Sequence, residues 1–489
     1  MNERQSPARR VASHARHTHP LQSALDLFAP PRPVRRARSA AFAVLFCAFA
    51  LYIAWHASQE TATRPVDELP LAAAHGEGPA SAAGAAVAAV NARPDIVQRG
   101  EYLTRVGDCA ACHTADPARP FAGGLPISTP FGRIYTPNIT PDTDTGIGQW
   151  SDADFMRAMH EGIRKGGERL YPAFPYVEFT RVSGQDVQAI RAYLKTLAPI
   201  HATPPANELH FPFNQRWLMQ LWNLFNFEEG RFVPDPQKSA EYNRGAYLVR
   251  GLAHCEECHT PRNLTQGLKK SERFSGATQA GWQAYNITPD RAGGIGGWSD
   301  DALASYLTTG VATGHANAAG PMAAVVQNST QYLTPEDLRS IGVFLRAQPA
   351  VAGGVTRSRD SFGQPANDDI TTLRGTRITA VDGVQLFVAN CASCHNWTGA
   401  GVGASAPGAY PSLIHNSVAG AASAGNLAMV ILHGVTRRTR DADVLMPGFG
   451  SQLSNDQIAA IANYVTKTFG NPQAAITADQ VAALRAQPQ

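Results

Sequence analysis

The pattern C-x-x-C-H occurs three times in this 489-residue chain and constrains its fold more than any other feature. Two thiols three positions apart at the start of a helix can bond to the two vinyl groups of one haem, and the adjacent imidazole can then ligate the iron. The cysteines and histidines concerned are Cys109, Cys112 and His113, then Cys255, Cys258 and His259, and finally Cys391, Cys394 and His395. The chain is therefore predicted to hold three covalently bound haem c groups.

Zinc binding and dithiol redox chemistry are the alternatives for paired cysteines. A structural zinc site takes four ligands from two neighbouring pairs, but each pair here belongs to a separate stretch of the chain. A thioredoxin-like dithiol needs a βαβ context and no adjacent histidine. The seventh cysteine, Cys47, lies in an apolar run, so no pair remains for a structural disulfide. Haem attachment is the interpretation that fits all three copies.

The sequence around the motifs is itself repeated, which indicates tandem domains. The first two copies share a G-x-Y-L segment before the cysteines, N-I-T-P-D at 138–142 and 286–290, and W-S-D at Trp150 and Trp298; the third lacks the middle segment. The repeats are predicted to end in amphipathic helices opened by capping boxes, which are Ser183 with Asp186, Thr334 with Asp337, and Ser454 with Gln457. Gly100, Gly245 and Gly383 suggest that the first and last helices of each repeat cross closely.

These patterns predict an all-α fold, with three tandem cytochrome c domains after a single N-terminal transmembrane helix. The domains are expected at 95–200, 239–350 and 379–470. A basic cytoplasmic tail at 1–38, a membrane anchor at 39–57 and a linker at 58–94 would precede them. The connection 201–238 contains Trp217, Met219, Trp222 and Phe225, which could pack between domains.

The charge distribution supports this order. Residues 1–38 carry eight arginines and two acidic residues, which leaves 42 − 8 = 34 basic and 39 − 2 = 37 acidic residues in the remainder. A slightly acidic body argues against nucleic-acid binding, which needs a basic face on a folded domain. The uncharged run from Ser39 to Trp55 approaches the ~20 residues needed to span a bilayer, and the arginines before it would hold the N-terminus inside. A cleaved signal peptide is the alternative, and either arrangement places the haem domains on the periplasmic side of the cytoplasmic membrane.

A haem iron in an electron carrier usually has a second axial ligand, and a methionine thioether raises its potential. Met322 follows a proline in G-P-M, 24 residues after Trp298, and Met446 stands in L-M-P-G-F-G shortly before the last closing helix. Both are predicted iron ligands. In the first repeat the same count from Trp150 reaches Phe174, which cannot ligate iron. The remaining candidates there are Met156, Met159 and His160 on the preceding helix, or a five-coordinate iron.

The three attachment motifs, N-I-T-P-D, W-S-D, the L-Y-P-A-x-P-Y loop and G-P-M resemble the trihaem cytochrome c subunits of membrane-bound alcohol, gluconate and fructose dehydrogenases. The chain is also similar to cytochromes paired with molybdenum hydroxylases. The resemblance implies a catalytic partner subunit, which would be a quinoprotein, a flavoprotein or a molybdenum hydroxylase, and a quinone or other respiratory acceptor at the membrane. In the sugar and alcohol group the position of Phe174 is typically Met, so the first haem departs from the pattern.

Two other functions remain open at this point. The first is a self-contained, membrane-anchored respiratory electron carrier that has no dehydrogenase partner. The second is a haem enzyme that acts at an open first haem, although nothing around His113 supplies a distal acid/base pair. As an electron-transfer subunit, the chain would perform no chemistry on the organic substrate itself.

Overall fold

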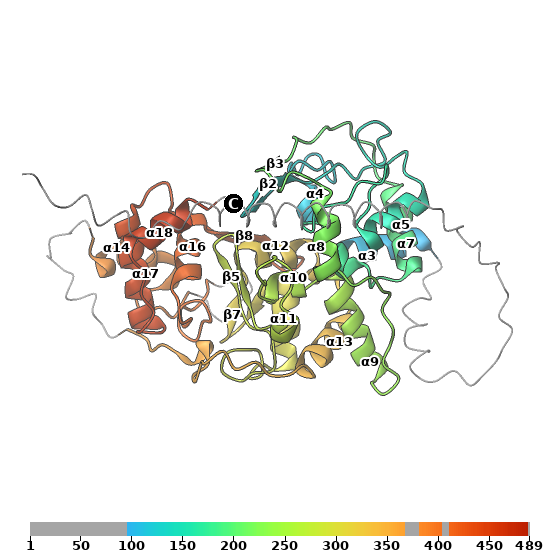
Figure 1. Ribbon diagram of the computed structural model, residues 1–489. Helices are drawn as coiled ribbons and strands as arrows, with labels where there is room; N and C mark the ends of the chain where they lie inside the picture. Colours follow the sequence, from blue (N-terminus) through green and yellow to red (C-terminus); the bar gives the residue numbers. More distant parts are fainter. Residues whose placement is uncertain (1–94, 367–380, 403–409, 488–489) are drawn as a thin grey trace, which may run out of the picture. The chain divides into compact units, whose positions relative to one another are not determined.

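The computed structural model describes residues 95–366, 381–402 and 410–487 (Figure 1). The predicted tail, anchor and linker at 1–94 lie outside the described residues, and so does Cys47. Within the three described ranges, no helix is both long and apolar enough to cross a membrane. The boundaries proposed for the three domains stay predictions, and the repeats are named below by their order in the sequence.

The predicted fold class, an all-α chain, is wrong. The described residues contain nine short strands, which form one three-stranded antiparallel sheet, β1–β2–β3, and three two-stranded hairpins. The strands occupy loops that show no helical period, where turn geometry decides the structure. Ala280 and Gly281, for example, both have positive φ and connect β4 to β5 by a two-residue turn, a geometry that suits hairpins.

The first repeat places its attachment motif directly after its first helix. Its closing helix begins at Ser183, whose hydroxyl accepts a hydrogen bond from the backbone N–H of Asp186. The elements of this repeat and of the connection after it are α3 (Ile96–Val106), α4 (Cys109–His113), β1 (Pro126–Thr129), β2 (Gly132–Tyr135), α5 (Asp152–Glu161), α6 (Tyr176–Phe179), α7 (Gly184–Leu194), β3 (Glu208–Leu209) and α8 (Leu218–Asn226).

The second repeat contains a π-helix that accommodates an additional residue. Gly245 lies ten positions before its cysteine and Gly100 lies nine before its own, and the wider π turn at η2 absorbs the difference. The elements are α9 (Ala240–Tyr247), η2 (Leu248–Leu252), α10 (Glu256–His259), η3 (Lys270–Glu272), β4 (Ala277–Gln279), β5 (Trp282–Ala284), α11 (Asp300–Thr309), β6 (Val311–Ala312), β7 (Ala316–Asn317), α12 (Gly320–Asn328), η4 (Thr330–Tyr332) and α13 (Pro335–Arg346).

The third repeat lacks the two shared middle segments and instead carries one hairpin between its last long helices. A single turn, η5 (Arg359–Ser361), precedes it. Its elements are α14 (Gly383–Asn390), α15 (Ala392–His395), α16 (Gly425–His433), β8 (Val435–Arg438), β9 (Asp443–Met446), α17 (Asn455–Phe469) and α18 (Ala478–Arg485). Helices α16, α17 and α18 pack on one another, and α14 packs on α17 (Figure 1).

The close helix crossing suggested by the glycines is confirmed in every repeat. Helix α3 packs on α7, α9 on α13, and α14 on α17. A Cβ atom on Gly100 would lie 1.9 Å from the Ala189 carbonyl oxygen, and one on Gly245 would lie 1.9 Å from the Ser340 oxygen. On Gly383 it would lie 2.5 Å from the Ala460 oxygen. Only glycine lets the helix backbones approach so closely.

The apolar faces predicted for the closing helices are buried. They contribute Val187, Ile190 and Leu194, then Leu338, Ile341 and Leu345, and then Ile458, Ile461 and Val465. The first two repeats share one apolar core, whereas the third has its own. The reciprocal part of the capping box is present at Ser454 and Gln457, whereas the carboxylates of Asp186 and Asp337 serve another purpose, described below.

Candidate haem sites

The structure gives the three attachment motifs the same local form. In each, a short helix starts at or just after the first cysteine and ends at the histidine: α4, α10 and α15. Residues i, i+3 and i+4 share one face of a helix, so both thiols and the imidazole of a motif lie on the same side. The six cysteines form no disulfide. Each motif therefore presents two free thiols and one imidazole together, as covalent haem attachment requires.

Each motif histidine is oriented by a backbone carbonyl. The Nδ1 atom of His113 lies 2.7 Å from the Pro137 oxygen, that of His259 lies 2.7 Å from the Tyr285 oxygen, and that of His395 lies 2.9 Å from the Pro411 oxygen. Because a carbonyl only accepts, Nδ1 must donate its proton, which leaves the Nε2 lone pair free. This hydrogen bond to the second nitrogen is the usual arrangement around a metal-ligating histidine.

The N-I-T-P-D segments position those carbonyl groups in the first two repeats. Asn138 directly follows Pro137, accepts from the backbone N–H of Thr140 and donates to the Ile200 carbonyl at 2.8 Å. Asn286 follows Tyr285 and makes the equivalent bonds to Thr288 and to the Val351 carbonyl. The asparagines thus tie the loop beside each histidine to the chain that leaves the repeat.

The third repeat, which lacks this segment, uses a serine instead. Ser412 follows Pro411, its hydroxyl donates toward the Ile414 carbonyl at 3.1 Å, and it accepts from the Ile414 N–H at 3.0 Å. The carbonyl partners of the histidines were not identified from the sequence. The repetition of N-I-T-P-D after each of the first two motifs was the available signal, but it does not indicate which atom the loop presents.

The electrostatics of the motifs suit haem attachment better than metal binding by thiolates. Burial lowers the pKa of His113, His259 and His395, so the imidazoles are neutral and able to ligate. Burial also raises the pKa of the Cys109 and Cys255 thiols to about 12, which disfavours a thiolate metal site. In the part of the chain that the structure describes, no three His, Cys, Asp or Glu side chains gather as a metal site.

The two predicted methionine ligands lie on different kinds of element. Met322 stands in the first turn of α12, after Pro321, and Met446 is the last residue of β9. Both side chains are partly exposed. Nothing in the structure tests their ligation, which stays a prediction.

The first repeat has core residues where a substitute ligand was considered. Met159 is buried in the apolar core, and Met156 approaches Gly184, whose Cβ position would lie 3.7 Å from the Met156 methyl. The Nε2 atom of buried His160 donates to the Val182 carbonyl at 2.9 Å. The Phe174 ring packs edge-on against Phe179 at 5.3 Å. These environments favour packing roles for all of them and leave no thioether in the loop at Phe174.

The chain is 42% identical over 409 residues to the fructose dehydrogenase cytochrome subunit of Gluconobacter japonicus, covering 81% of this chain and 83% of that protein. It belongs to the family of dehydrogenase cytochrome c subunits. This cytochrome subunit is also 36% identical over 415 residues to the gluconate 2-dehydrogenase cytochrome c subunit of Pantoea cypripedii, covering 82% of this chain and 92% of that protein. The resemblance inferred from the motifs is confirmed.

Two further comparisons show which parts of the proteins are similar. This cytochrome subunit is 40% identical over 398 residues to a nicotinate dehydrogenase subunit of Pseudomonas putida, a match that covers 80% of the chain but only 32% of that protein. The cytochrome c family itself matches residues 97–198 and 380–469, which contain the first and third attachment motifs.

The first two repeats of this cytochrome subunit are joined by a reciprocal pair of tyrosines. The Tyr102 hydroxyl donates to Asp337 in the second repeat at 2.5 Å, and the Tyr247 hydroxyl donates to Asp186 in the first. Each hydroxyl also accepts a backbone N–H, from Thr334 at 3.4 Å and from Ser183 at 3.1 Å.

The same carboxylates bind an arginine of their own repeat. Asp186 accepts from Arg99, and Asp337 accepts from Arg244 at 2.7 Å. In the third repeat Asp382 and Gln385 occupy the corresponding arginine and tyrosine positions, so this pairing is limited to the first two. From the sequence alone the two aspartates are expected only as caps. The signal was the R-G-x-Y-L segment that only the first two repeats share.

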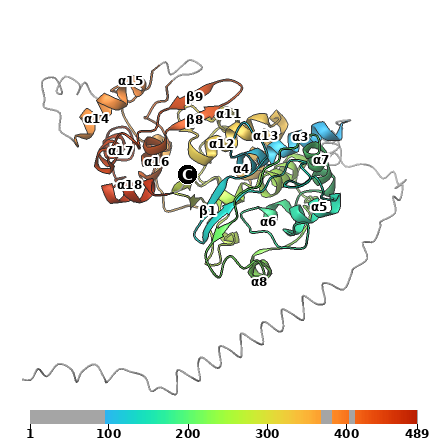
Figure 2. The same cartoon turned by 90° about the horizontal axis from the view of Figure 1, so that it is seen from above.

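Contacts connect the segments around the three attachment motifs. The His254 Nε2 atom, next to Cys255, lies 3.4 Å from the carbonyl oxygen of Gly107, two residues before Cys109. Helix α12, which carries Met322, contacts both α4 of the first site and β8 of the third repeat (Figure 2). Strand β8 pairs with β9, where Val435 lies opposite Met446. Helix α12 of the second repeat therefore lies between the attachment helix of the first repeat and the hairpin of the third.

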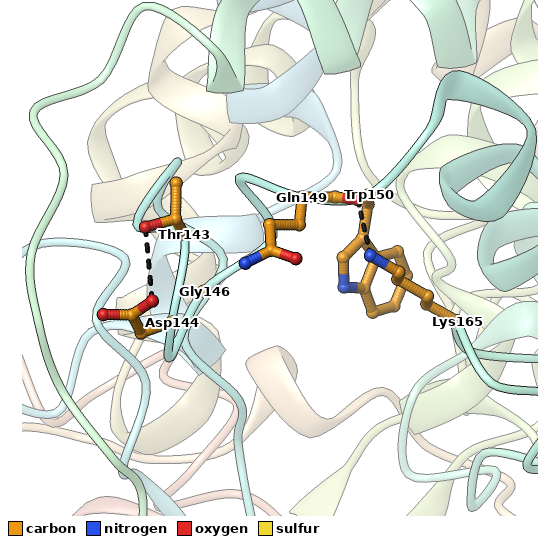
Figure 3. Close-up of a pocket in the computed structure, with 6 residues that line it drawn as sticks. All are labelled: Thr143, Asp144, Gly146, Gln149, Trp150 and Lys165. Carbon is orange, nitrogen blue, oxygen red and sulfur yellow. Dashed lines mark hydrogen bonds between the residues drawn. The ribbon is translucent and has the colours of Figure 1, made fainter.

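Two other features lie apart from these sites. An open polar pocket in the first repeat contains none of the predicted site residues (Figure 3). It is lined by Thr143, Asp144, Gly146, Gln149, Trp150 and Lys165.

In the connection after the first repeat, Trp222 donates to the Thr265 carbonyl, but Trp217 and Phe225 are 52% and 70% exposed. The expectation that these aromatic residues pack between domains is thus wrong for Trp217 and Phe225.

Proposed function

We propose that this chain is the three-haem electron-transfer subunit of a dehydrogenase complex, which accepts electrons from a catalytic subunit and passes them to a quinone or another respiratory acceptor. The observation that carries the proposal is the threefold occurrence of one arrangement, two free thiols beside a histidine whose Nδ1 donates to a carbonyl. The names of the relatives, cytochrome subunits of fructose and gluconate dehydrogenases, support a dehydrogenase as the partner.

The residues present fit haem c at each site. The cysteine thiols would form thioether bonds, His113, His259 and His395 would be the proximal ligands, and Met322 and Met446 would be the distal ligands of the second and third sites. Haem supplies a one-electron couple at iron, which needs no proton or group transfer from the protein. The protein's part is to orient the imidazoles, to exclude water from the sites and to keep the sites close to one another.

The adjacency of the sites supports a route through the whole chain. Helix α12 contacts the attachment helix of the first site and the hairpin that ends at Met446. Electrons entering at one end would thus reach the other through the second site. We also place the haem domains on the periplasmic side of the cytoplasmic membrane, because the arginine-rich segment before an uncharged stretch is typical of exported proteins.

The proposal is tested by counting covalent haems. Acid-acetone extraction followed by a pyridine haemochrome assay should leave about three haems on each chain. Replacing both cysteines of one motif by alanine should reduce the count by one, and replacing Cys47→Ala should not change it. A count near zero in the unmodified protein would refute haem attachment. Purification from the native membrane should bring down a flavin, pyrroloquinoline quinone or molybdenum cofactor with the partner subunit, whereas the absence of such a cofactor would favour a self-contained carrier.

A further inference from the structure

Two arginines at the junction of the second and third repeats, Arg437, which is buried, and Arg359, which is partly buried, form no salt bridge among the described residues. Arg437 on β8 is 1% exposed, and its Nη1 donates to the Ala318 carbonyl at 2.6 Å. Arg359, the first residue of η5, donates to the Gly293 carbonyl. The Nε atom of each is buried without a hydrogen-bond partner among the described residues. Buried charges are normally paired, because leaving one uncompensated is costly.

Asp360, the acidic residue next to Arg359 in the sequence, is already engaged. The Asp360 carboxylate accepts from the Nδ1 atom of His315 at 2.5 Å and also binds the Ser358 hydroxyl. The hydrogen bonds of Arg359 and Arg437 go instead to neutral carbonyl oxygens. An anionic group that fits between these arginines would complete their hydrogen bonding.

Both guanidinium groups lie against segments of the second haem site. The Arg359 guanidinium is 4.2 Å from the centre of the Tyr285 ring, and the Tyr285 carbonyl accepts the hydrogen bond of His259. Arg437 lies over Gly310, where a Cβ atom would be 2.4 Å from its Nε. The strand that carries Arg437 contacts α12, the helix of Met322. Arg359 thus approaches the second site from the side of His259, and Arg437 approaches it from the helix that carries Met322.

We propose that Arg437, together with Arg359, binds the propionate carboxylates of the second haem, so that the third repeat completes the cofactor site of the second. The inference rests on the haem assignment proposed above and adds residues that no attachment motif contains. Guanidinium groups match carboxylates in geometry and charge, and haem is the carboxylate-bearing group that the neighbouring motif would hold. Because Gly310 leaves room for the guanidinium, the arginine and the glycine are parts of the same site.

The arrangement has an electrochemical consequence. Oxidation of a haem adds one positive charge, which a nearby arginine disfavours and an unpaired propionate favours. Removing the Arg437 charge should therefore lower the potential of the second haem. A role limited to packing would change stability and leave the potential unaltered.

The test is a spectroelectrochemical titration of the purified full-length protein, after its haem content has been measured. Arg437→Gln should lower the midpoint potential of one component, the same component that Met322→His displaces. Arg438→Gln is the matched control, because Arg438 is the next residue on β8 and is exposed to solvent. It should leave all potentials unchanged. Arg359→Gln should lower the same component as Arg437→Gln.

The outcomes that contradict the inference are distinct from failure of the proposed function. If the haems are present and Arg437→Gln shifts no potential, or shifts it no more than Arg438→Gln does, the inference is overturned. Arg437→Lys keeps the positive charge and serves as the test if the glutamine variant does not fold. It should keep the potential of the second haem nearer the wild-type value. A potential as far below wild type as that of Arg359→Gln would overturn the inference. If the wild-type protein has no haem bound to Cys255 and Cys258, the proposed function is overturned as well.

Discussion

Removing the Tyr247 hydroxyl should weaken the contact between the first two repeats. This hydroxyl donates to the buried carboxylate of Asp186 and accepts the Ser183 N–H. Hydrogen bonds to charged groups contribute about 1.5–3 kcal/mol, and Arg99 still pairs with the carboxylate after the change. We therefore expect Tyr247→Phe to lower the free energy of unfolding by about 1.5–3 kcal/mol, and the melting temperature of the two-repeat unit by roughly 3–12 °C.

The assay is thermal and urea unfolding followed by circular dichroism, with the haem content of each variant matched. Tyr102→Phe should have a similar effect, because its hydroxyl makes the equivalent bond to Asp337. Arg244 binds Asp337 and lies 5.6 Å from the Tyr247 ring, so the two tyrosines belong to one network and the loss in the double variant should differ from the sum of both. Tyr242→Phe is the control on the same helix, since its ring packs on Phe344 and its hydroxyl makes no hydrogen bond in the described residues. A loss for Tyr247→Phe no larger than for Tyr242→Phe would refute the reasoning.

Three further predictions follow from single sites. Phe174 leaves the first haem without a loop thioether, so one ferrous haem should bind carbon monoxide, and Phe174→Met should abolish that binding and raise one potential; unaltered binding would contradict it. Burial and Arg231 lower the pKa of His160 from 6.5 to about 4. Between these two pH values the imidazole is protonated in the unfolded chain and neutral in the folded protein. The stability that is present above pH 6.5 is therefore lost as the pH falls toward 4. Between pH 7 and 5 the loss should be about 2 kcal/mol, and it should be absent in His160→Gln; an equal loss in that variant would assign it elsewhere. Gly245→Ala would place a Cβ atom 1.9 Å from the Ser340 oxygen and should cost about 3 kcal/mol in urea unfolding, whereas Gly342→Ala, with its nearest neighbour at 3.5 Å, should be tolerated.

The sequence pattern predicts the acidic residues of the closing helices only as caps, but two of them have other partners in the fold. A capping box is a local pattern, and it is complete at Ser454 and Gln457. Asp186 and Asp337 occupy the same helix position, yet they bind arginine and tyrosine side chains. Which donor reaches a carboxylate depends on the neighbouring helix and on the other repeat.

The sequence by itself predicted the attachment motifs, the repeat and the helix crossings. Two thiols and an imidazole at fixed spacing predict haem attachment because all three act within one helical turn. Glycines at the crossings were informative because only the absence of a Cβ atom permits such contact. These features depend on residues that are near one another in the chain, or on a single steric requirement.

Only the tertiary structure decided the strands, the carbonyl partners of the histidines and the connection between repeats. Strand pairing and the choice of the Pro137, Tyr285 and Pro411 carbonyls depend on loops that return from a distance to the attachment helix. Arg437 lies 119 residues from the Ala318 carbonyl that it binds, and no local pattern marks this contact. Polar groups select partners by where the packed chain brings them, and that position is set only when the whole fold has formed.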